Sequence, residues 1–205
     1  MLFKLKNVEY KLANQKILSK ISFNINKGNH LLILGPSGSG KTTLLNLMTG
    51  LLRVSGGEVL FEDINFSSLL DKDLDDLRSK NFGLIFQKLH LINHLNVRQN
   101  IALAQNKFNS LDIEELIGDL GLSKKSNQMI SNLSVGEAQR VAIARGIANK
   151  PKVIFADEPT SSLDDLNTQK VMELIFSQIK KTDSTLIVST HDNRIKKYFS
   201  RLMEL

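Results

Sequence analysis

Apolar and polar residues alternate in the first part of the chain with the period of a half-buried strand. Residues 21–25 show this alternation and are followed by a Lys-Gly-Asn turn. The continuous apolar run 31–34 predicts a strand that is buried on both faces. Leucines recur through 43–50, and the run ends at Gly50, which predicts a helix after a glycine-rich turn.

The middle of the chain changes to helical spacing. Residues 68–80 carry leucines three or four positions apart, as one face of a helix requires. Two further short helices are expected at 97–105 and 112–120. These segments predict a helical insertion, or helical subdomain, over about residues 68–150.

The last part of the chain returns to strands. Buried strands are expected at 153–156 and 185–188, with a helix at 166–181 between them and a short final helix from Asp192. Alternation of strands and helices predicts parallel pairing with right-handed crossovers. The predicted fold class is therefore α/β, with a mainly parallel sheet, an N-terminal antiparallel β subdomain and the helical insertion, all in a single domain over 1–205.

The composition excludes several classes of protein. The chain has 205 residues, of which 41% are hydrophobic and 23% charged, as in a globular domain. It has no Cys, which excludes disulfide frameworks, thiolate zinc sites and Cys nucleophiles. No apolar run approaches the ~18 residues of a membrane-spanning helix, and the lysines at the start do not fit a signal peptide.

The net charge of +6 does not by itself indicate a nucleic-acid partner. The lysines are dispersed, and there is no Trp to form a stacking platform for bases. We therefore expect a solvated basic surface and no nucleic-acid partner.

A phosphate-binding loop is expected directly after the strand 31–34. Residues 35–42 read Gly-Pro-Ser-Gly-Ser-Gly-Lys-Thr and match G-x-x-x-x-G-K-[ST] at every fixed position. Small residues let backbone N–H groups surround a phosphate, and the following helix N-terminus favours negative charge. In this pattern Lys41 reaches the β- and γ-phosphates and Thr42 binds Mg²⁺.

Two carboxylates follow the predicted strand 153–156. Taken alone, Asp157 and Glu158 are usual for a solvated turn. An acid at the carboxyl end of a parallel strand lies where α/β proteins bind ligands, however. With a phosphate-binding loop in the same chain, Asp157 is expected at the Mg²⁺ ion and Glu158 at the attacking water.

Further motifs follow in a fixed order. Residues 133–137 read Leu-Ser-Val-Gly-Glu, residues 161–164 read Ser-Ser-Leu-Asp, Gln87 ends an apolar run and His191 follows Ser-Thr. With these motifs the chain resembles the ATP-binding cassette (ABC) ATPases over essentially its whole length. They match the signature motif, the D-loop, the Q-loop glutamine and the switch histidine, and Tyr10 matches the aromatic that stacks on adenine.

The resemblance implies three sets of site residues. Catalysis is assigned to Glu158, His191 and Gln87, and Mg²⁺ to Thr42, Gln87 and Asp157. ATP contacts are assigned to Tyr10, Gly35, Pro36, Ser37, Gly38, Ser39, Gly40, Lys41, Thr42, Thr43, Ser134, Gly136, Glu137 and Asp164.

Each of the additional residues also has a structural interpretation. Gln87 could be a polar residue at a strand end, and His191 a surface residue before a helix. Tyr10 could pack within the first sheet. Ser134 could cap the helix that follows it. The shared order and spacing of the motifs favour the functional interpretation.

Two residues of the signature depart from the common family form, which has Gly at position 135 and Gln at position 137. The β-branched side chain of Val135 resists a positive φ and is expected to crowd the approach to a phosphate. Glu137 is a familiar variant in the lipoprotein-releasing, macrolide-exporting and cell-division members, to which residues 82–97 and 156–160 are also similar. The departures bear on the rate of hydrolysis and not on nucleotide binding.

The function implied by the resemblance is that of an ATP-binding and ATP-hydrolysing subunit of a transporter. Two copies would face each other head to tail around two ATP and drive a separate integral membrane permease subunit. The chain would be cytoplasmic and peripheral on the inner face of the membrane. The alternative is a regulatory ABC ATPase that signals across the membrane without transport, as in the cell-division branch.

Overall fold

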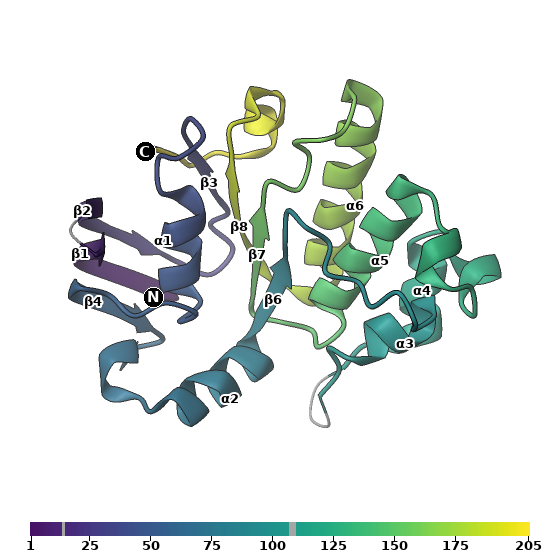
Figure 1. Cartoon of the computed structure of the whole chain (residues 1–205), viewed down its shortest axis with the longest axis horizontal. Helices are drawn as coiled ribbons and strands as arrows, with labels where there is room; N and C mark the ends of the chain where they lie inside the picture. Colours follow the sequence, from purple (N-terminus) through teal and green to yellow (C-terminus); the bar gives the residue numbers. More distant parts are fainter. Residues whose placement is uncertain (14, 107–109) are drawn as a thin grey trace.

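The computed structural model describes residues 1–13, 15–106 and 110–205, which form two β-sheets (Figure 1). One sheet is antiparallel, in the order β2-β1-β4-β5, and the other is parallel, in the order β6-β7-β8-β3-β9. This confirms the predicted fold class. The strands are β1 (Phe3–Leu12), β2 (Gln15–Ile25), β3 (Leu31–Leu34), β4 (Gly56–Phe61), β5 (Ile64–Asn65), β6 (Phe82–Ile85), β7 (Val153–Asp157), β8 (Thr185–Thr190) and β9 (Leu202–Glu204).

The helices connect and cover these sheets. The α-helices are α1 (Lys41–Met48), α2 (Asp71–Asn81), α3 (Val97–Ala102), α4 (Ile113–Asp119), α5 (Val135–Ile147) and α6 (Asp165–Thr182). Short 3₁₀ turns lie at Phe66–Ser68, Ser123–Lys125, Ile130–Asn132 and Asn193–Tyr198. None of the helices in the described part of the chain combines the length and the apolar character that crossing a membrane requires.

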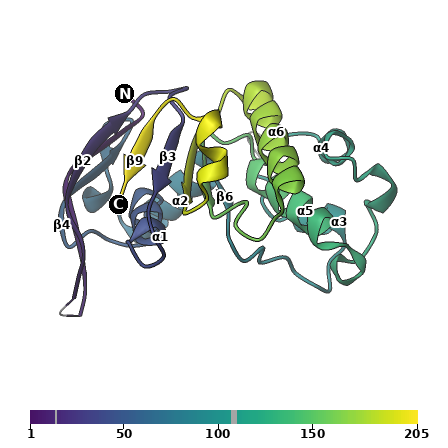
Figure 2. The same ribbon diagram turned by 90° about the horizontal axis from the view of Figure 1, so that it is seen from above.

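The parallel sheet is buried on both faces because side chains alternate between them. On β3, Leu31 and Ile33 join a cluster with α1 and the antiparallel sheet, whereas Leu32 and Leu34 join a second cluster with α3–α6. The strands β7 and β8 divide their side chains in the same way. The parallel sheet therefore lies between the antiparallel sheet and the helices α3–α6 (Figures 1 and 2).

Three details of the predicted elements are wrong. The range 68–150 is not helical throughout, because β6 lies within it and pairs in parallel with β7. Helix α1 begins at Lys41 and not at 43, since Gly40 ends the preceding loop with a φ of 98°. After Asp192 the chain forms a 3₁₀ turn and then β9, which pairs with β3 and was not expected.

A cluster of phenyl rings joins the two sheets. Phe3 of β1 lies 5.7 Å from Phe82 of β6 and 5.8 Å from Phe155 of β7, measured between ring centroids. Phe61 of β4 meets Phe82 edge to face at 4.9 Å. These contacts stabilise the antiparallel sheet on one face of the parallel sheet.

Two glycines bring β6 and α5 into close contact. A Cβ on Gly83 would lie 1.9 Å from the carbonyl oxygen of Gly146, which is backbone and cannot move aside by a side-chain rotation. A Cβ on Gly146 would lie 2.8 Å from Ile85. The strand that leads to Gln87 and the helix that follows the signature motif are thus packed backbone to backbone.

We predict that Gly83→Ala lowers the free energy of unfolding by about 2 kcal/mol or more, because the added methyl group forces β6 and α5 apart. The matched control is Gly118→Ala in α4, where the nearest atom to an added Cβ is the Ser123 hydroxyl at 3.7 Å. The control is expected to keep or slightly raise stability, since Ala favours helix. Chemical denaturation measures both variants, and equal stabilities would contradict this account of the contact.

Candidate functional site

The carboxyl ends of four neighbouring strands lie at the same edge of the parallel sheet. In the pairing register, Asp157 of β7 is opposite Ser189 of β8, and Leu34 of β3 is opposite Thr190. Ile85 of β6 is opposite Ala156 of β7, so that Gln87 leaves the sheet at this edge as well. The phosphate-binding loop, the two carboxylates, Gln87 and His191 therefore start from adjacent strand ends, where α/β proteins bind ligands.

The phosphate-binding loop is a tight turn whose lysine lies against it. Gly38 and Gly40 have positive φ, and a Cβ on Gly40 would lie 2.7 Å from the side chain of Leu18. Lys41 is 6% exposed, and its Nζ donates to the carbonyl oxygens of Gly35 at 2.8 Å and Pro36 at 2.9 Å. The loop thus presents a desolvated cation next to backbone N–H groups at the start of α1.

Asp157 connects β7 to the phosphate-binding loop and to β8. The Thr42 hydroxyl donates to one of its carboxylate oxygens at 2.8 Å, and the Ser189 hydroxyl donates to the other. These are hard oxygen ligands of the kind that Mg²⁺ prefers. The arrangement brings together Thr42 and Asp157, two of the three predicted Mg²⁺ ligands.

Glu158 is fixed by several groups at once. Its carboxylate accepts hydrogen bonds from the Thr190 hydroxyl at 2.7 Å and the His191 backbone N–H at 3.2 Å. The ring Nδ1 of His191 lies 2.9 Å from it, and Nζ of Lys41 lies 3.7 Å from it. Glu158 also has a φ of 48°, which is uncommon for a residue other than glycine.

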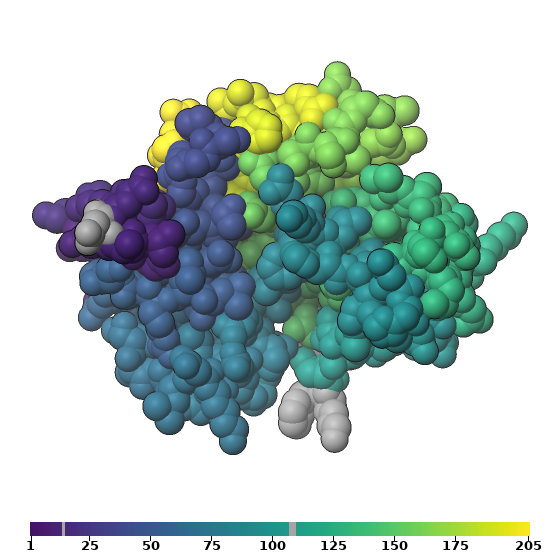
Figure 3. Space-filling model, viewed as in Figure 1, coloured from purple at the N-terminus to yellow at the C-terminus, as the bar shows by residue number. Residues whose placement is uncertain are grey.

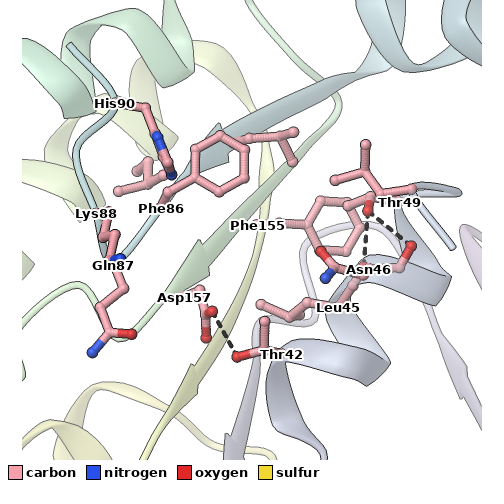
Figure 4. Close-up of a pocket in the computed structure, with 13 residues that line it drawn as sticks. Thr42, Leu45, Asn46, Thr49, Phe86, Gln87, Lys88, His90, Phe155 and Asp157 are labelled. Atoms are coloured by element: carbon pink, nitrogen blue, oxygen red, sulfur yellow. Dashed lines mark hydrogen bonds between the residues drawn. The ribbon is translucent and has the colours of Figure 1, made fainter. Parts of the chain in front are cut away.

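Gln87 lines a pocket of about 390 Å³ beside the phosphate-binding loop. Thr42 and Asp157 line the same pocket, and Figure 4 shows the hydrogen bond that joins them. Other parts of its wall are apolar and come from Leu45 of α1, from Leu84 and Ile85 of β6, and from Phe86, which follows β6. The pocket therefore extends from the candidate Mg²⁺ ligands to the surface around Gln87.

Tyr10 lies in the antiparallel sheet near the same loop. It pairs across β1 and β2 with Leu18, the residue that contacts Gly40. Its side chain is partly buried against the core. This position is compatible with both predicted roles of Tyr10, packing in the sheet and stacking on adenine.

Ser134, Val135 and Gly136 of the signature lie at the start of α5 and are exposed to solvent. The Ser134 hydroxyl accepts from the Glu137 backbone N–H at 3.3 Å, and the Glu137 carboxylate accepts from the Ser134 N–H at 2.9 Å, which is a capping box. Val135 is 73% exposed as the first helical residue and does not have a positive φ. The expected backbone strain at Val135 is therefore absent.

Asp164 also caps a helix. Its carboxylate accepts hydrogen bonds from the backbone N–H and the side-chain amide of Asn167, both at 2.8 Å, at the start of α6. These bonds, the backbone one first, lower the pKa of Asp164. Its carboxylate is thus engaged within its own turn.

The signature residues and the phosphate-binding loop lie in different parts of the molecule. Helix α1, which follows the loop, lies in the left half of Figure 1, and α3, α4 and α5 lie in the right half. The space-filling view shows the same division between blue and green segments (Figure 3). Among the described residues, no hydrogen bond or ion pair joins Ser134, Gly136 or Glu137 to residues 35–43.

Sequence reasoning missed three residues that fix the site. Ser189 and Thr190 orient the two carboxylates, and their place at the end of a strand before His191 is the signal that could have identified them. Arg145 of α5 donates at 2.6 Å to the carbonyl oxygens of Leu89 and His90, just after Gln87. No pattern in the sequence indicates a bond from a side chain to distant backbone carbonyls.

The site fits a nucleoside triphosphate with Mg²⁺. The buried hydroxyl of Ser39 in the loop has no hydrogen-bond partner among the described residues, which suits a position that contacts phosphate. Lys41 is bonded to carbonyl oxygens of its own loop, and phosphate oxygens are stronger partners for a cation. Thr42 and Asp157 supply the oxygen ligands.

Sequence comparison with known proteins finds a family model and a relative that match most of the chain. A family model described as ABC transporter matches residues 18–161. The putative hemin import ATP-binding protein HrtA of Staphylococcus aureus (strain Newman) is 40% identical over 208 residues, which cover 98% of this chain and 93% of that protein.

Two solved structures of ABC proteins are similar to this chain in fold. The dimeric post-hydrolysis structure of the ATP-binding cassette MJ0796 bound to ADP and Pi has a TM-score of 0.88 and 33% identity, covering 100% of this chain and 94% of that chain. CbiO1 from Clostridium perfringens, part of the ABC transporter complex cbiONQ, has a TM-score of 0.85 and 28% identity, covering 99% of this chain and 84% of that chain. The chain therefore belongs to the ABC transporter family, as one of its ATP-binding and ATP-hydrolysing cassettes.

Proposed function

We propose that this chain hydrolyses ATP with Mg²⁺ at the carboxyl edge of its parallel sheet and works as the energy-supplying subunit of a membrane transporter. The observation that supports the proposal most directly is that Lys41, Asp157 and Glu158 lie together at adjacent strand ends. Catalysis of phosphoryl transfer depends mainly on such positioning and on electrostatic stabilisation.

Each group has a distinct role in this proposal. Lys41 exchanges its carbonyl partners for phosphate oxygens, and Thr42, Asp157 and Gln87 hold Mg²⁺, which neutralises charge on the phosphates when bound. Glu158 orients the attacking water, because its carboxylate is already fixed by Thr190 and by the His191 backbone. The remaining assigned residues contact the nucleotide, with Tyr10 at the adenine.

We propose that the site is completed by a second copy of the chain. Ser134 and Gly136 are exposed at the start of a helix, a position that favours anions, and they lie apart from the phosphate-binding loop of their own chain. The MJ0796 cassette is dimeric. In a head-to-tail dimer, each ATP lies between the loop of one copy and the signature of the other.

We also propose that the pocket beside Gln87 receives an integral membrane permease subunit on the cytoplasmic face of the membrane. Its wall is partly apolar, and Leu51, which lines it, is 45% exposed. Arg145 and the contact of Gly83 with Gly146 connect this pocket to α5, which begins at the signature. A partner bound there is thereby linked to both halves of the nucleotide site.

Replacing Glu158 with Gln tests the catalytic role. We expect ATP binding to persist and hydrolysis to fall by about 10²- to 10⁴-fold, the usual contribution of a positioned acid–base group. Because the γ-phosphate is then not removed, the variant should accumulate as an ATP-bound dimer, which size-exclusion chromatography with Mg²⁺ detects. ATP hydrolysis by the variant at the wild-type rate would show that Glu158 is not a catalytic residue.

Replacing Lys41 with Ala tests the phosphate-binding role. The variant loses a buried cationic contact, so we expect ATP affinity to fall by about 30-fold or more in calorimetric titration. Lys72→Ala, which removes an exposed lysine of α2, is the control with the same change of charge. If both variants bind ATP equally well, Lys41 does not hold the phosphates.

Replacing Leu51 with Glu tests the docking pocket. The tagged wild-type chain is expected to capture a multi-span membrane protein from detergent-solubilised membranes. We expect the variant not to capture this protein, while its ATP affinity is unchanged. Leu12→Glu, at another exposed leucine, is the control and should retain the partner. If both variants still capture the membrane protein, the permease binds to another surface of the chain.

A further inference from the structure

An ionised carboxylate lies in the signature turn of this chain. The side chain of Glu137 is only 17% exposed and accepts hydrogen bonds from Lys125 Nζ at 2.6 Å and from the Ser134 N–H at 2.9 Å. These two bonds, the one from Lys125 first, lower the pKa of Glu137 to about 2. Protonation therefore does not remove this negative charge at neutral pH.

The position of this charge is unfavourable for the proposed dimer. Ser134 and Gly136 have to approach the γ-phosphate bound to the second copy, and Glu137 is one residue further along the same turn. Like charges that approach each other as water is excluded repel strongly when no opposite charge compensates them. A carboxylate at this place thus needs a cation that stays with it.

The ion pair supplies that cation from outside α5. Lys125 ends the 3₁₀ turn Ser123–Lys125, twelve positions before Glu137, and its side chain is 35% exposed. Arg140, on the next turn of α5, places Nη1 3.9 Å from where a Cβ of Gly136 would lie. Among the described residues, however, the ion pair of Glu137 is with Lys125.

We propose that Lys125 is a positioning residue of the ATP sandwich, which neutralises Glu137 so that the signature turn can close on the γ-phosphate of the second copy. The inference rests on the proposed head-to-tail dimer and deepens it. In this account Lys125 acts through Glu137 and does not itself contact the nucleotide. Its effect should disappear when residue 137 carries no charge.

A double-mutant cycle tests this dependence. All proteins carry Glu158→Gln, so that dimers accumulate without turnover, and the set is Lys125→Ala, Glu137→Gln and both together. Gln is accepted at the third position of a capping box, so Glu137→Gln preserves the cap of α5. The readout is the ATP concentration that gives half-maximal dimer, by size exclusion with light scattering in Mg²⁺.

We expect Lys125→Ala to raise that ATP concentration about tenfold when Glu137 is present, and less than about twofold when residue 137 is Gln. Lys125→Arg should restore dimerisation, since it keeps the charge. Lys124→Ala, the neighbouring lysine, should have little effect. Binding of ATP to the monomer at low protein concentration should be unchanged from the parent in the Lys125 and Lys124 variants, because the phosphate-binding loop is not altered.

Three results would overturn the inference. An equal loss from Lys125→Ala in both backgrounds would mean that Lys125 contacts the nucleotide or shapes the turn directly. An equal loss from Lys124→Ala would mean that overall charge is responsible. If the parent Glu158→Gln protein binds ATP but forms no dimer, the proposed sandwich itself fails, and the inference fails with it.

Discussion

The close approach of the buried Lys41 to the carboxylate of Glu158, beside Asp157, is the constraint on which the rest of the structure depends. Holding the charges of the buried Lys41 and the half-buried Asp157 and Glu158 together is costly unless each charge has partners. The partners come from two strand ends: the loop carbonyls after β3, and the hydroxyls of Ser189 and Thr190 at the end of β8. The parallel register of β3, β7 and β8 is what brings these groups within hydrogen-bond distance.

The same chain carries a second charged site, the turn at the start of α5, where Glu137 pairs with Lys125. The capping box of Ser134 and Glu137 satisfies the start of α5, yet leaves the turn exposed and apart from the phosphate-binding loop. With the charge of Glu137 neutralised by Lys125, this turn suits the proposed contact with a polyanion bound to another copy. The contact of Gly83 with Gly146 and the bonds of Arg145 give α5 a fixed relation to the segment after β6. Helix α5 thereby connects the proposed dimer interface to the pocket beside Gln87.

Much of this organisation could be predicted from the sequence because it is local. A phosphate-binding loop is defined by consecutive residues, and the apolar run before Asp157 is sufficient to indicate a buried strand. The strand β6 was hidden within a range that otherwise reads as helical, since Phe82–Ile85 is short and contains a glycine. It becomes a strand through its pairing with β7, and β9 through its pairing with β3. The partners of the carboxylates, and the pair of Lys125 with Glu137, join residues that only the fold brings together.

The central claim, that each site is completed by a second copy, can be measured by mixing two inactive variants. Lys41→Ala removes the phosphate-binding lysine and leaves the signature intact, whereas Ser134→Arg blocks the signature and leaves the phosphate-binding loop intact. A mixed dimer joins the intact loop of one chain to the intact signature of the other. The account predicts that ATPase activity of the mixture exceeds the sum of the two separate proteins, with a dependence on their ratio. Activity equal to that sum at every ratio would contradict the shared site.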